Sequence, residues 1–366
     1  MRIREIVFNN FRSFRGERRI SFVDPDTDMV RPVTVLTGSN GSGKTTVLEA
    51  IEELLKYMYN PMQKSTLVRE ALESGLIDMT VELMPEEIGE SASIFPTLRL
   101  HIAVGKYELA STELQQGSGS IIRRLKTSEP LGEIDNDIGL TIALRIRADQ
   151  QQSETNVYGG WLYFPHDRRL SYTRGGPIES PDDKQEWLFR FSAEDQWRGS
   201  LEQLWVWQNY LDLEQHSKHN QATPSLPTFI ESVEKVLGEK RRIFVEEGRV
   251  RVTTPYAVDG KETSVRLDQL PSGEQQVLLL FGELARRRRQ GCVLAIDEIE
   301  NSLHPTLQRL VMWNLNRLAR EWDSQVIVST HSLEVINTVR GGAFINLDYP
   351  EDRFNLSLPE TDASQA

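Results

Sequence analysis

The sequence predicts an α/β fold with a mostly parallel core sheet, a mixed or antiparallel N-terminal sheet and a small helical insertion. Two observations lead to this fold class. Short apolar runs alternate with amphipathic helical stretches near both ends of the chain, as in units that build a parallel sheet. Between them, several strand-like runs are separated by polar loops rather than by helices, which favours a second sheet with antiparallel pairs.

The first lobe, residues 1–170, is expected to carry most of the strands. The stretch KTTVLEAIEELLKYM, residues 44–58, has apolar residues at helical spacing and begins directly after a glycine-rich turn. The order strand, glycine-rich turn and helix is the setting in which a phosphate-binding loop occurs. Apolar runs predict strands over residues 2–8, 19–23, 33–37, 76–83, 97–104, 139–148 and 161–165.

A glycine- and proline-rich stretch, TRGGPIESPDD, is expected to link this lobe to the next part of the chain. The pattern of apolar residues over 171–240 predicts a helical insertion, with helices over 186–216 and 227–238. Aromatic residues in such helices are mostly core, but their density here makes the stretch our candidate for a partner-binding surface. The aromatic residues are Trp187, Trp197, Trp205, Trp207 and Tyr210.

The C-terminal lobe, residues 241–350, returns to alternating strands and helices. The pattern predicts a hairpin over 242–254, strands over 292–297 and 325–330, and a helix over 304–322. The last residues, 351–366, are polar and poor in apolar residues, so we expect a disordered tail.

Composition excludes several classes of protein. The chain has 366 residues, of which 39% are apolar and 26% charged, close to the averages for globular domains. No apolar run is long enough to cross a bilayer, and the N-terminus lacks the apolar centre of a secretory signal. The single cysteine, Cys292, excludes an internal disulfide and gives no sign of an oxidising compartment. Together with the lack of a membrane segment and of a secretory signal, this leads us to expect a cytoplasmic protein without a membrane partner. The formal net charge of -12 repels nucleic acid, so DNA binding would require a local basic surface.

The strongest chemical pattern is GSNGSGKT, residues 38–45, between an expected strand and an expected helix. It fits G-x-x-x-x-G-K-[ST], the P-loop, whose backbone N–H groups and helix N-terminus bind phosphate. We expect Lys44 to reach the outer phosphate oxygens and Thr45 to offer its hydroxyl to Mg²⁺. The residues assigned to nucleotide binding in this segment are Gly38, Ser39, Asn40, Gly41, Ser42, Gly43, Lys44, Thr45 and Thr46.

Two adjacent acids, Asp297 and Glu298, follow an apolar run of the C-terminal lobe. A carboxylate at a strand end can hold Mg²⁺ through its water shell, and a second one beside it can orient and deprotonate the attacking water. We assign Asp297 to the metal and Glu298 to the water. Adjacent acids can also be a charge pair at a helix N-terminus, but a P-loop in the same chain favours the catalytic interpretation.

Two more patterns suggest contacts with phosphate. His331 follows the apolar run QVIVST and can donate a hydrogen bond to a terminal phosphate, although a histidine at a strand end is more often structural. LPSGEQQ, residues 270–276, places Ser272 and Gly273 at the start of a helix, where unpaired donors bind anions. The alternative is a helix cap, with Ser272 as the cap residue and Glu274 in the first turn.

The order P-loop, Ser-Gly, strand with Asp-Glu and strand with His resembles that of ABC-type ATPases, in the branch that contains RecF, the SMC and Rad50 heads and the OLD-family ATPases. The resemblance covers about residues 1–50 and 160–345. The segments that carry it are IVFNNFRSF, WLYFPHDRRLSYTRG, LPSGEQQ and ENSLHP. It implies an ABC-type P-loop NTPase head that uses ATP and Mg²⁺.

The resemblance also implies residue roles. Arg12 is expected near the nucleotide phosphates, and His331 matches the switch histidine. Ser272 and Gly273, with Glu274 in the same signature segment, are expected to contact the γ-phosphate of ATP bound to a second molecule. This arrangement implies a homodimer or a higher assembly held together through shared ATP sites.

Two departures from the family pattern stand out. Glu274 replaces the second glycine of the signature, a variant that is familiar in this branch. The glutamine of the family's Q-loop is not placed by the sequence. Gln150, Gln151 and Gln152 are candidates, and so is the FPHDR segment, which contains no glutamine.

The sequence shows no sustained heptads, and too few residues follow His331 for an appended nuclease domain. We therefore expect a stand-alone ATPase that regulates a separate effector, a nuclease or toxin, in bacterial anti-phage defence, as similar ATPases do. The alternatives are a RecF-like DNA-repair ATPase and a nucleotide-gated scaffold with negligible turnover. A transporter ATPase fits less well. Possible DNA contacts lie in the basic hairpin at Lys240, Arg241, Arg242, Arg249 and Arg251, and a solvated face of a sheet is an equally good interpretation of the same residues.

Overall fold

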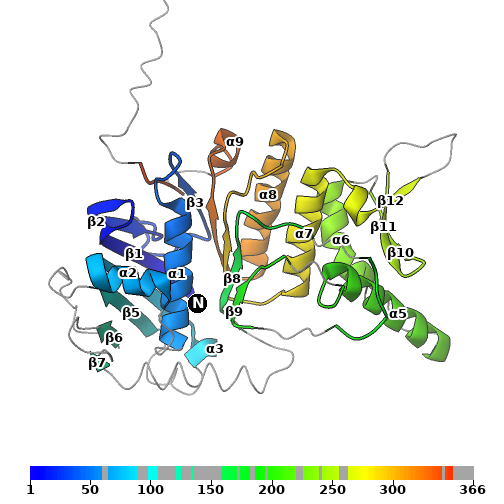
Figure 1. Cartoon of the computed structure of the whole chain (residues 1–366), viewed down its shortest axis with the longest axis horizontal. Coiled ribbons are helices and arrows are strands. Elements are labelled where there is room, and N and C mark those ends of the chain that lie inside the picture. The colour runs from blue at the N-terminus through cyan, green and yellow to red at the C-terminus, as the bar shows by residue number, and fades with distance from the viewer. Residues whose placement is uncertain are drawn as a thin grey trace, which may run out of the picture.

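A computed structural model of the chain gives the arrangement shown in Figure 1. The structure describes residues 1–59, 65–88, 98–105, 121–124, 133–134, 158–170, 174–181, 186–193, 197–219, 226–238, 241–254, 263–339 and 343–348. Three sheets organise this part of the chain. The expected strand over 139–148 and the expected tail over 351–366 lie outside the described residues.

The N-terminal sheet has six strands in the order β2-β1-β4-β5-β6-β7. Most neighbours pair antiparallel, but β5 and β6 are parallel, so the sheet is mixed as predicted. Its strands are β1 (Arg2–Phe11), β2 (Phe14–Ser21), β4 (Leu76–Leu83), β5 (Leu98–Gly105), β6 (Ile121–Arg124) and β7 (Glu133–Ile134). The helices associated with it are α2 (Thr66–Ser74) and α3 (Pro85–Ile88).

The core sheet has six strands in the order β15-β3-β14-β13-β8-β9, and all of its neighbours are parallel. The central strands are short and buried on both faces, which explains their nearly continuous apolar sequences. The strands are β3 (Val33–Thr37), β8 (Trp161–Phe164), β9 (Leu188–Arg190), β13 (Val293–Ile296), β14 (Gln325–Ser329) and β15 (Phe344–Asn346).

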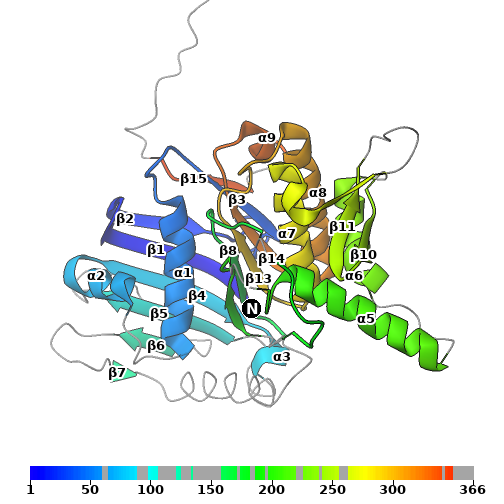
Figure 2. The ribbon, with the colours of Figure 1, turned by 45° about the vertical axis from the view of Figure 1, so that its right-hand side comes forward.

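The core sheet separates two hydrophobic cores. Side chains of its strands alternate between the faces, so that Leu36 and Ile327 join one core while Val35 and Val328 join the other. The first core contains α1 (Lys44–Tyr59) and the N-terminal sheet. The second contains α7 (Ser272–Arg286) and α8 (Pro305–Glu321). The helix after the P-loop and the signature helix therefore cover opposite faces of one sheet, as Figures 1 and 2 show.

The helical insertion lies beside α7, and one helix of it extends outward from the molecule (Figure 2). It consists of α5 (Leu201–His219) and α6 (Leu226–Leu237), next to a small antiparallel sheet in the order β10-β11-β12. The strands of this small sheet are β10 (Ile243–Glu246), β11 (Arg249–Thr253) and β12 (Ser264–Arg266). A short 3-10 turn, Leu267–Gln269, leads to α7, and α9 (Leu333–Ile336) follows β14.

One secondary-structure prediction in the insertion is wrong. Residues 186–216 were expected to be helical throughout, but Leu188–Arg190 form β9, and the helix begins only at Leu201. Parallel pairing with β8 outweighs the local helical pattern because it completes the edge of the core sheet. Most of the aromatic residues are core, with Trp205 fully buried and Tyr210 exposed.

The predicted fold class is confirmed: the chain is an α/β protein with a mixed N-terminal sheet, a parallel core sheet and a small helical insertion. Among the described residues, no helix is both long and apolar enough to span a bilayer.

Candidate nucleotide site

The site lies where the parallel strands end. β8, β13, β14 and β3 are in register, so that Phe164 pairs with Ile296 and Ser329 pairs with Leu36. Because the strands are parallel, the segments that follow them emerge at one edge of the sheet, where ligands bind in open α/β folds. The P-loop and the segments that contain Asp297 and His331 all begin at this edge.

The P-loop has the backbone shape that its glycines allow. Gly41 and Gly43 have φ angles of 81° and 100°, values that favour glycine. A Cβ atom on Gly43 would lie 2.5 Å from the ring of Phe14 and 2.6 Å from the Ser13 hydroxyl. The turn between β1 and β2 therefore packs directly against the P-loop. The Ser42 hydroxyl is buried in the loop without a hydrogen-bond partner among the described residues, as expected for a group that a ligand would satisfy.

Lys44 is folded over the loop that precedes it. Its ammonium group donates to the carbonyl oxygens of Gly38 at 2.9 Å and Ser39 at 3.0 Å. Burial lowers the pKa of Lys44, and nearby acids, Asp297 foremost, oppose that shift. The lysine is thus largely buried and held by weak neutral acceptors, which the charged oxygens of a phosphate would replace favourably.

Thr45 and Asp297 meet, although 252 positions separate them in the chain. The Thr45 hydroxyl donates to Asp297 Oδ2 at 2.8 Å. Asp297 is fully buried, and the Ser329 hydroxyl donates to its other carboxylate oxygen. A hydroxyl and a carboxylate are hard oxygen donors of the kind that Mg²⁺ prefers.

Glu298 has a strained backbone with a φ of 46°, which is unusual for a residue with a side chain. Its N–H donates to the Ser329 hydroxyl at 2.8 Å, and its carbonyl accepts from Arg168 Nη2 at 3.1 Å. The turn is therefore fixed from both sides, which presents the Glu298 side chain in a defined direction.

Arg168 is the last residue of the FPHDR segment, and the sequence analysis gave it no role of its own. It is 3% exposed, and its Nη1 donates to the carbonyls of Asp297 at 2.5 Å and Pro165 at 3.0 Å. Burial lowers the pKa of Arg168 to about 10, with Asp297 opposing, so the group stays charged at neutral pH. The Arg168 carbonyl in turn accepts from Gln276 of α7 at 3.0 Å, which ties the signature helix to the Asp-Glu turn.

His331 lies at the end of β14 with an exposed side chain. Its backbone N–H donates to Glu300 at 2.6 Å, and the Thr330 hydroxyl donates to the other oxygen of the same carboxylate at 2.7 Å. Glu300, three residues after Asp297, thus fixes the backbone that carries His331. The sequence had singled out neither Glu300 nor this contact.

Ser272 is the first residue of α7, and it does not cap the helix. Pro271 occupies the cap position, and no side chain accepts a capping hydrogen bond there. The helix-cap alternative for Ser272 is therefore wrong. Gly273 packs against the ENSLHP segment, residues 300–305, where an added Cβ would lie 2.9 Å from the Ser302 carbonyl oxygen. Glu274 forms an ion pair with Arg241, two residues before β10.

Arg12 lies on the turn that packs against the P-loop. Its side chain pairs with Glu70 at 2.7 Å and with Glu49 at 3.5 Å. These contacts, led by the hydrogen bond that Arg12 donates to Glu70, raise the pKa of Arg12. The structure therefore places Arg12 beside the loop with its guanidinium directed to two acids.

Ser272 and Gly273 lie on the α7 side of the core sheet, and no hydrogen bond or ion pair joins them to the described P-loop residues.

Asp348 is a second addition to the predicted site. It follows β15, and its Oδ1 accepts from the Ser39 N–H and from the Ser39 hydroxyl, each at 2.7 Å. Partial burial acts against ionisation, but the hydrogen bonds from Ser39 and the charge of Lys44 keep the pKa of Asp348 below its ordinary value. The Ser39 peptide is thus held by Asp348 at its N–H and by Lys44 at its carbonyl.

The structure describes one of the Q-loop alternatives, the FPHDR segment. Gln150, Gln151 and Gln152 lie outside the described residues. The FPHDR segment follows β8 and places His166 beside Asp297, with 3.7 Å between His166 Nδ1 and Asp297 Oδ2. The His166 carbonyl accepts from the Asn301 side chain at 2.9 Å, so the backbone at this position is fixed.

A metal ion at this site would need ligands from a nucleotide as well. Within the described ranges, no group of three or more His, Cys, Asp or Glu side chains is placed to hold a metal. Mg²⁺ commonly takes one or two protein ligands together with substrate phosphates and water. Thr45 and Asp297 next to a phosphate-binding loop fit that pattern.

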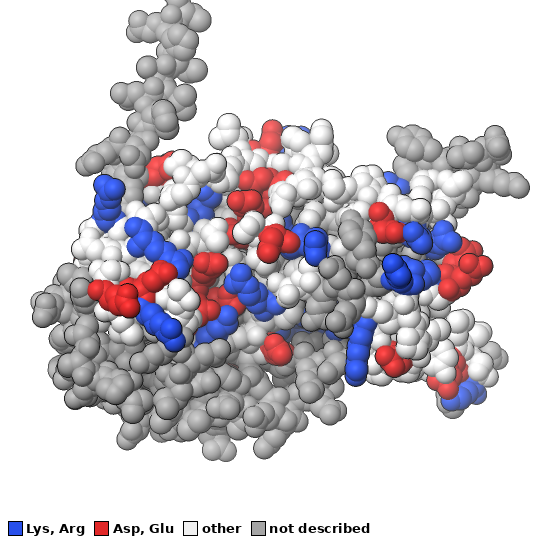
Figure 3. All heavy atoms as spheres, in the orientation of Figure 1, with Lys and Arg blue, Asp and Glu red and all other residues white. Residues whose placement is uncertain are grey.

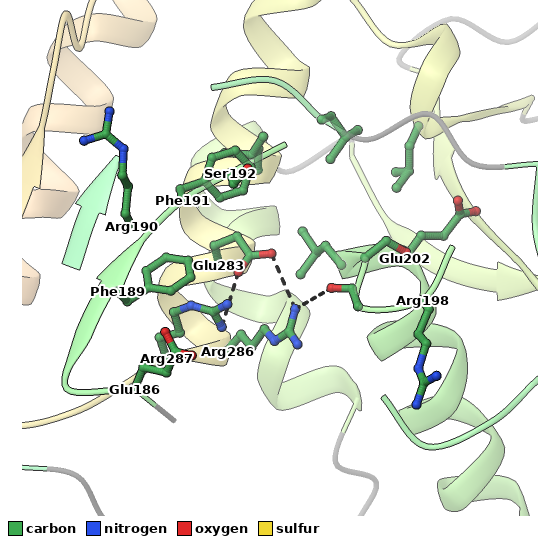
Figure 4. Close-up of a pocket in the computed structure, with 16 residues that line it drawn as sticks. Glu186, Phe189, Arg190, Phe191, Ser192, Arg198, Glu202, Glu283, Arg286 and Arg287 are labelled. Carbon is green, nitrogen blue, oxygen red and sulfur yellow. Dashed lines mark hydrogen bonds and ion pairs between the residues drawn. The ribbon is translucent and has the colours of Figure 1, made fainter. Parts of the chain in front are cut away.

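A separate cavity of about 450 Å³ lies between β9, α5 and α7. Figure 4 shows Glu283 at its centre, directed toward Arg286 and Arg287. Both arginines pair with Glu283, and Arg287 also lies over the ring of Phe189 at 3.7 Å. None of the nucleotide-site residues lines this cavity.

Two family models match the chain. One, described as "AAA domain", matches residues 5–159, and the other, described as "AAA domain, putative AbiEii toxin, Type IV TA system", matches residues 220–337. The first segment contains the P-loop, and the second contains the signature, the Asp-Glu turn and His331. The two matches together contain the four motifs, from the P-loop to His331, on whose order the sequence analysis relied, and they support the resemblance to an ABC-type ATPase of the RecF- and SMC-like branch.

A particular relative is the "Retron Vc95 probable ATPase" of Vibrio cholerae serotype O1 biovar El Tor. It is 22% identical over 409 residues, which cover 98% of this chain and 76% of the relative. The SMC head domain from Thermotoga maritima is a similar solved structure, with 14% identity, a TM-score of 0.44 and 94% of each chain covered. The SmcHead bound to the C-winged helix domain of ScpA has 11% identity, a TM-score of 0.46 and the same coverage.

Loss of Asp348 should loosen the P-loop. In Asp348→Ala the Ser39 N–H loses its acceptor, so its amide hydrogen exchange at pH 7 should be about fivefold faster, as expected for a charge-assisted hydrogen bond that solvent screens. Because the folded pKa is depressed, this stabilisation is complete above about pH 4 and is lost as the pH falls through the folded pKa. Asp323→Ala, which removes the exposed partner of Arg2, is the matched control. Unchanged exchange at Ser39 would contradict the assignment.

Proposed function

We propose that this protein binds ATP with Mg²⁺, dimerises around two shared ATP molecules, hydrolyses them, and thereby regulates a separate nuclease or toxin in bacterial anti-phage defence. The observation that carries the catalytic part is the contact between Thr45 and the buried Asp297, beside a fixed Glu298 turn. The relatives support the effector part, because one family model is described by a putative toxin and one relative is a probable ATPase of a retron.

The P-loop residues supply the phosphate contacts in this proposal. The residues Gly38, Ser39, Asn40, Gly41, Ser42, Gly43 and Thr46 form the loop and the first turn of α1, whose N–H groups face a bound phosphate. Lys44 exchanges its two carbonyl acceptors for phosphate oxygens. His331, on an adjacent strand end, donates to the terminal phosphate, and the nearby Arg12 turn supports the loop from the other side.

The Asp-Glu turn supplies the hydrolytic chemistry. Bound Mg²⁺ polarises the phosphates and neutralises charge that develops during transfer. Thr45 and Asp297 would hold it. Glu298, whose backbone is fixed by Arg168 and Ser329, would orient the attacking water and accept its proton.

The position of α7 supports the dimer in this proposal. The P-loop helix and the signature helix cover opposite faces of the core sheet, and Ser272 at the start of α7 is exposed. An uncapped helix N-terminus with an exposed hydroxyl is an anion site without a ligand from its own chain. A two-fold dimer would bring each Ser272 and Gly273 to the ATP of the partner.

Replacing Glu298 should separate binding from hydrolysis. Glu298→Gln keeps the size of the side chain and the backbone contacts, so ATP binding should persist while turnover falls by about 10²- to 10⁴-fold, as for loss of a general base. An ATP-held dimer should accumulate, which size-exclusion chromatography with light scattering would detect. Glu334→Gln, on α9 at the same end of the sheet, is the control. Wild-type turnover in Glu298→Gln would remove the assignment.

Mixing two inactive variants should restore activity if Ser272 acts on the partner's ATP. Lys44→Ala and Ser272→Arg should each be inactive alone, because every shared site then carries one lesion. A mixed dimer has one site with both lesions and one intact site, so ATPase activity should return, up to half of the wild-type rate per dimer. ATP-dependent dimerisation should be measured in parallel. Folded, verified mixed dimers with neither property would show that Ser272 acts within its own chain.

The DNA-repair alternative receives little support from the charges of the hairpin. Arg241 pairs with Glu274, Arg249 pairs with Glu202, and Arg251 lies 3.7 Å from Glu246. Lys240 lies outside the described residues. Figure 3 shows basic and acidic side chains interspersed on this face rather than gathered in one stripe. Arg286 and Arg289 are buried, consistent with a structural role at the end of α7.

The effector should associate with the ATP-bound form. Full-length Glu298→Gln, purified from its native host with ATP, should retain a nuclease or toxin encoded beside it, whereas Lys44→Ala should not. Mass spectrometry of the two preparations identifies the retained protein. Retention of a replication protein together with steeply salt-dependent DNA binding would favour the repair function instead. Equal retention by both variants would contradict regulation by ATP.

A further inference from the structure

The cavity between β9, α5 and α7 holds charged side chains that the nucleotide site does not use. Glu283, Arg286 and Arg287 come from the end of α7, where Arg287 is the C-cap residue. Their spacing of three and four positions places them on one face of the helix, and all three line the cavity. Glu283 is 5% exposed and Arg286 is 7% exposed. These charges are therefore largely removed from water and need partners inside the cavity.

The ion pairs within this group are long. Glu283 lies 3.8 Å from Arg286 Nη1 and 3.5 Å from Arg287 Nη1, and both distances exceed that of a good hydrogen bond. Glu283 Oε2 is buried and accepts no hydrogen bond from a described residue. Because buried carboxylate oxygens normally accept hydrogen bonds, Glu283 can accept one from a donor inside the cavity.

Both guanidinium groups are held in place by a second element. Arg286 Nη1 donates to the Gly199 carbonyl at 2.9 Å, just before α5. The Arg287 guanidinium lies 3.7 Å from the centre of the Phe189 ring on β9. A guanidinium presents N–H donors in a planar fork that suits the oxygens of an oxyanion. The cavity therefore combines positioned N–H donors with a carboxylate acceptor, as a preorganised binding site does (Figure 4).

We propose that this cavity binds an oxyanion that carries a proton, namely hydrogen phosphate. Arg286 and Arg287 donate to two of its oxygens, and Glu283 accepts from its O–H group. Inorganic phosphate keeps a proton throughout the neutral pH range, whereas sulfate has none. A phosphate monoester, whose second pKa is about 6, has mostly lost its proton at pH 7.5. The Glu283 carboxylate repels an oxyanion without a proton, so the site selects inorganic phosphate.

The wall of the cavity is connected to both ATP-binding elements. Arg190 of β9 lines the cavity and forms a 2.6 Å ion pair with the buried Glu52 of α1, the helix that follows the P-loop. The opposite wall is α7, which begins at Ser272. Inorganic phosphate is also the product of the ATP hydrolysis proposed above. The site itself is inferred from the charges of the cavity and does not depend on that proposed function.

Calorimetry at pH 7.5 tests the site in the full chain. Lys44→Ala serves as the parent, because it removes the lysine contact to phosphate at the P-loop. The parent should bind inorganic phosphate at least about tenfold more tightly than sulfate or glucose 6-phosphate. Adding Glu283→Gln should erase that difference, mainly through tighter binding of sulfate. Adding Arg287→Gln should weaken phosphate binding by about tenfold, because one charge-assisted donor is lost.

Glu321→Gln is the matched control, since it changes an exposed glutamate that pairs with an arginine on α8, and it should leave all three affinities unchanged. Circular dichroism checks that each variant is folded. Equally tight binding of sulfate by the parent, or unchanged selectivity in folded Glu283→Gln, would overturn the role of Glu283. Unchanged phosphate affinity in folded Arg287→Gln, or no phosphate binding by the folded parent, would overturn the site. Neither result would bear on the ATPase test with Glu298→Gln.

Discussion

The buried carboxylate of Asp297 is the group on which the geometry of the whole site depends. A charge with no exposed surface persists only where hydrogen bonds compensate for the loss of water. Thr45 of α1 and Ser329 of β14 supply those hydrogen bonds, and Arg168 binds the carbonyl of the same residue. The P-loop helix and two strand ends, distant in sequence, are therefore held to one residue.

The next residue, Glu298, has a strained backbone and is also hydrogen-bonded to two other parts of the chain. Glu298 keeps an unfavourable backbone conformation because Ser329 and Arg168 satisfy both of its peptide groups. Gln276 of α7 donates a hydrogen bond to the Arg168 carbonyl, and the Arg168 side chain donates one to the Glu298 carbonyl. The signature helix is therefore linked to the Asp-Glu turn through Arg168. A displacement of α7 would act directly on the turn that presents Glu298.

The division into two hydrophobic cores places the signature helix and the P-loop helix on opposite faces of the core sheet. Alternation of side chains along the core strands commits α1 to one face and α7 to the other. The arginines near α7 pair with glutamates of the same region, such as Arg249 with Glu202 and Arg241 with Glu274. These pairs position the small sheet and α7, and they leave less positive charge for a partner.

The sequence by itself determined the fold class, the P-loop and the order of the acidic and histidine segments, because these depend on local periodicity and on residue types at fixed spacing. Only the tertiary structure decided that β9 is a strand and which contacts Arg168, Glu300, Asp348 and His166 make at the site. Each of these contacts joins residues far apart in the chain or on neighbouring strand ends, and no local pattern encodes the register that brings them together. The motifs could therefore be predicted from the sequence, whereas the contacts around them depended on the order and register of the strands.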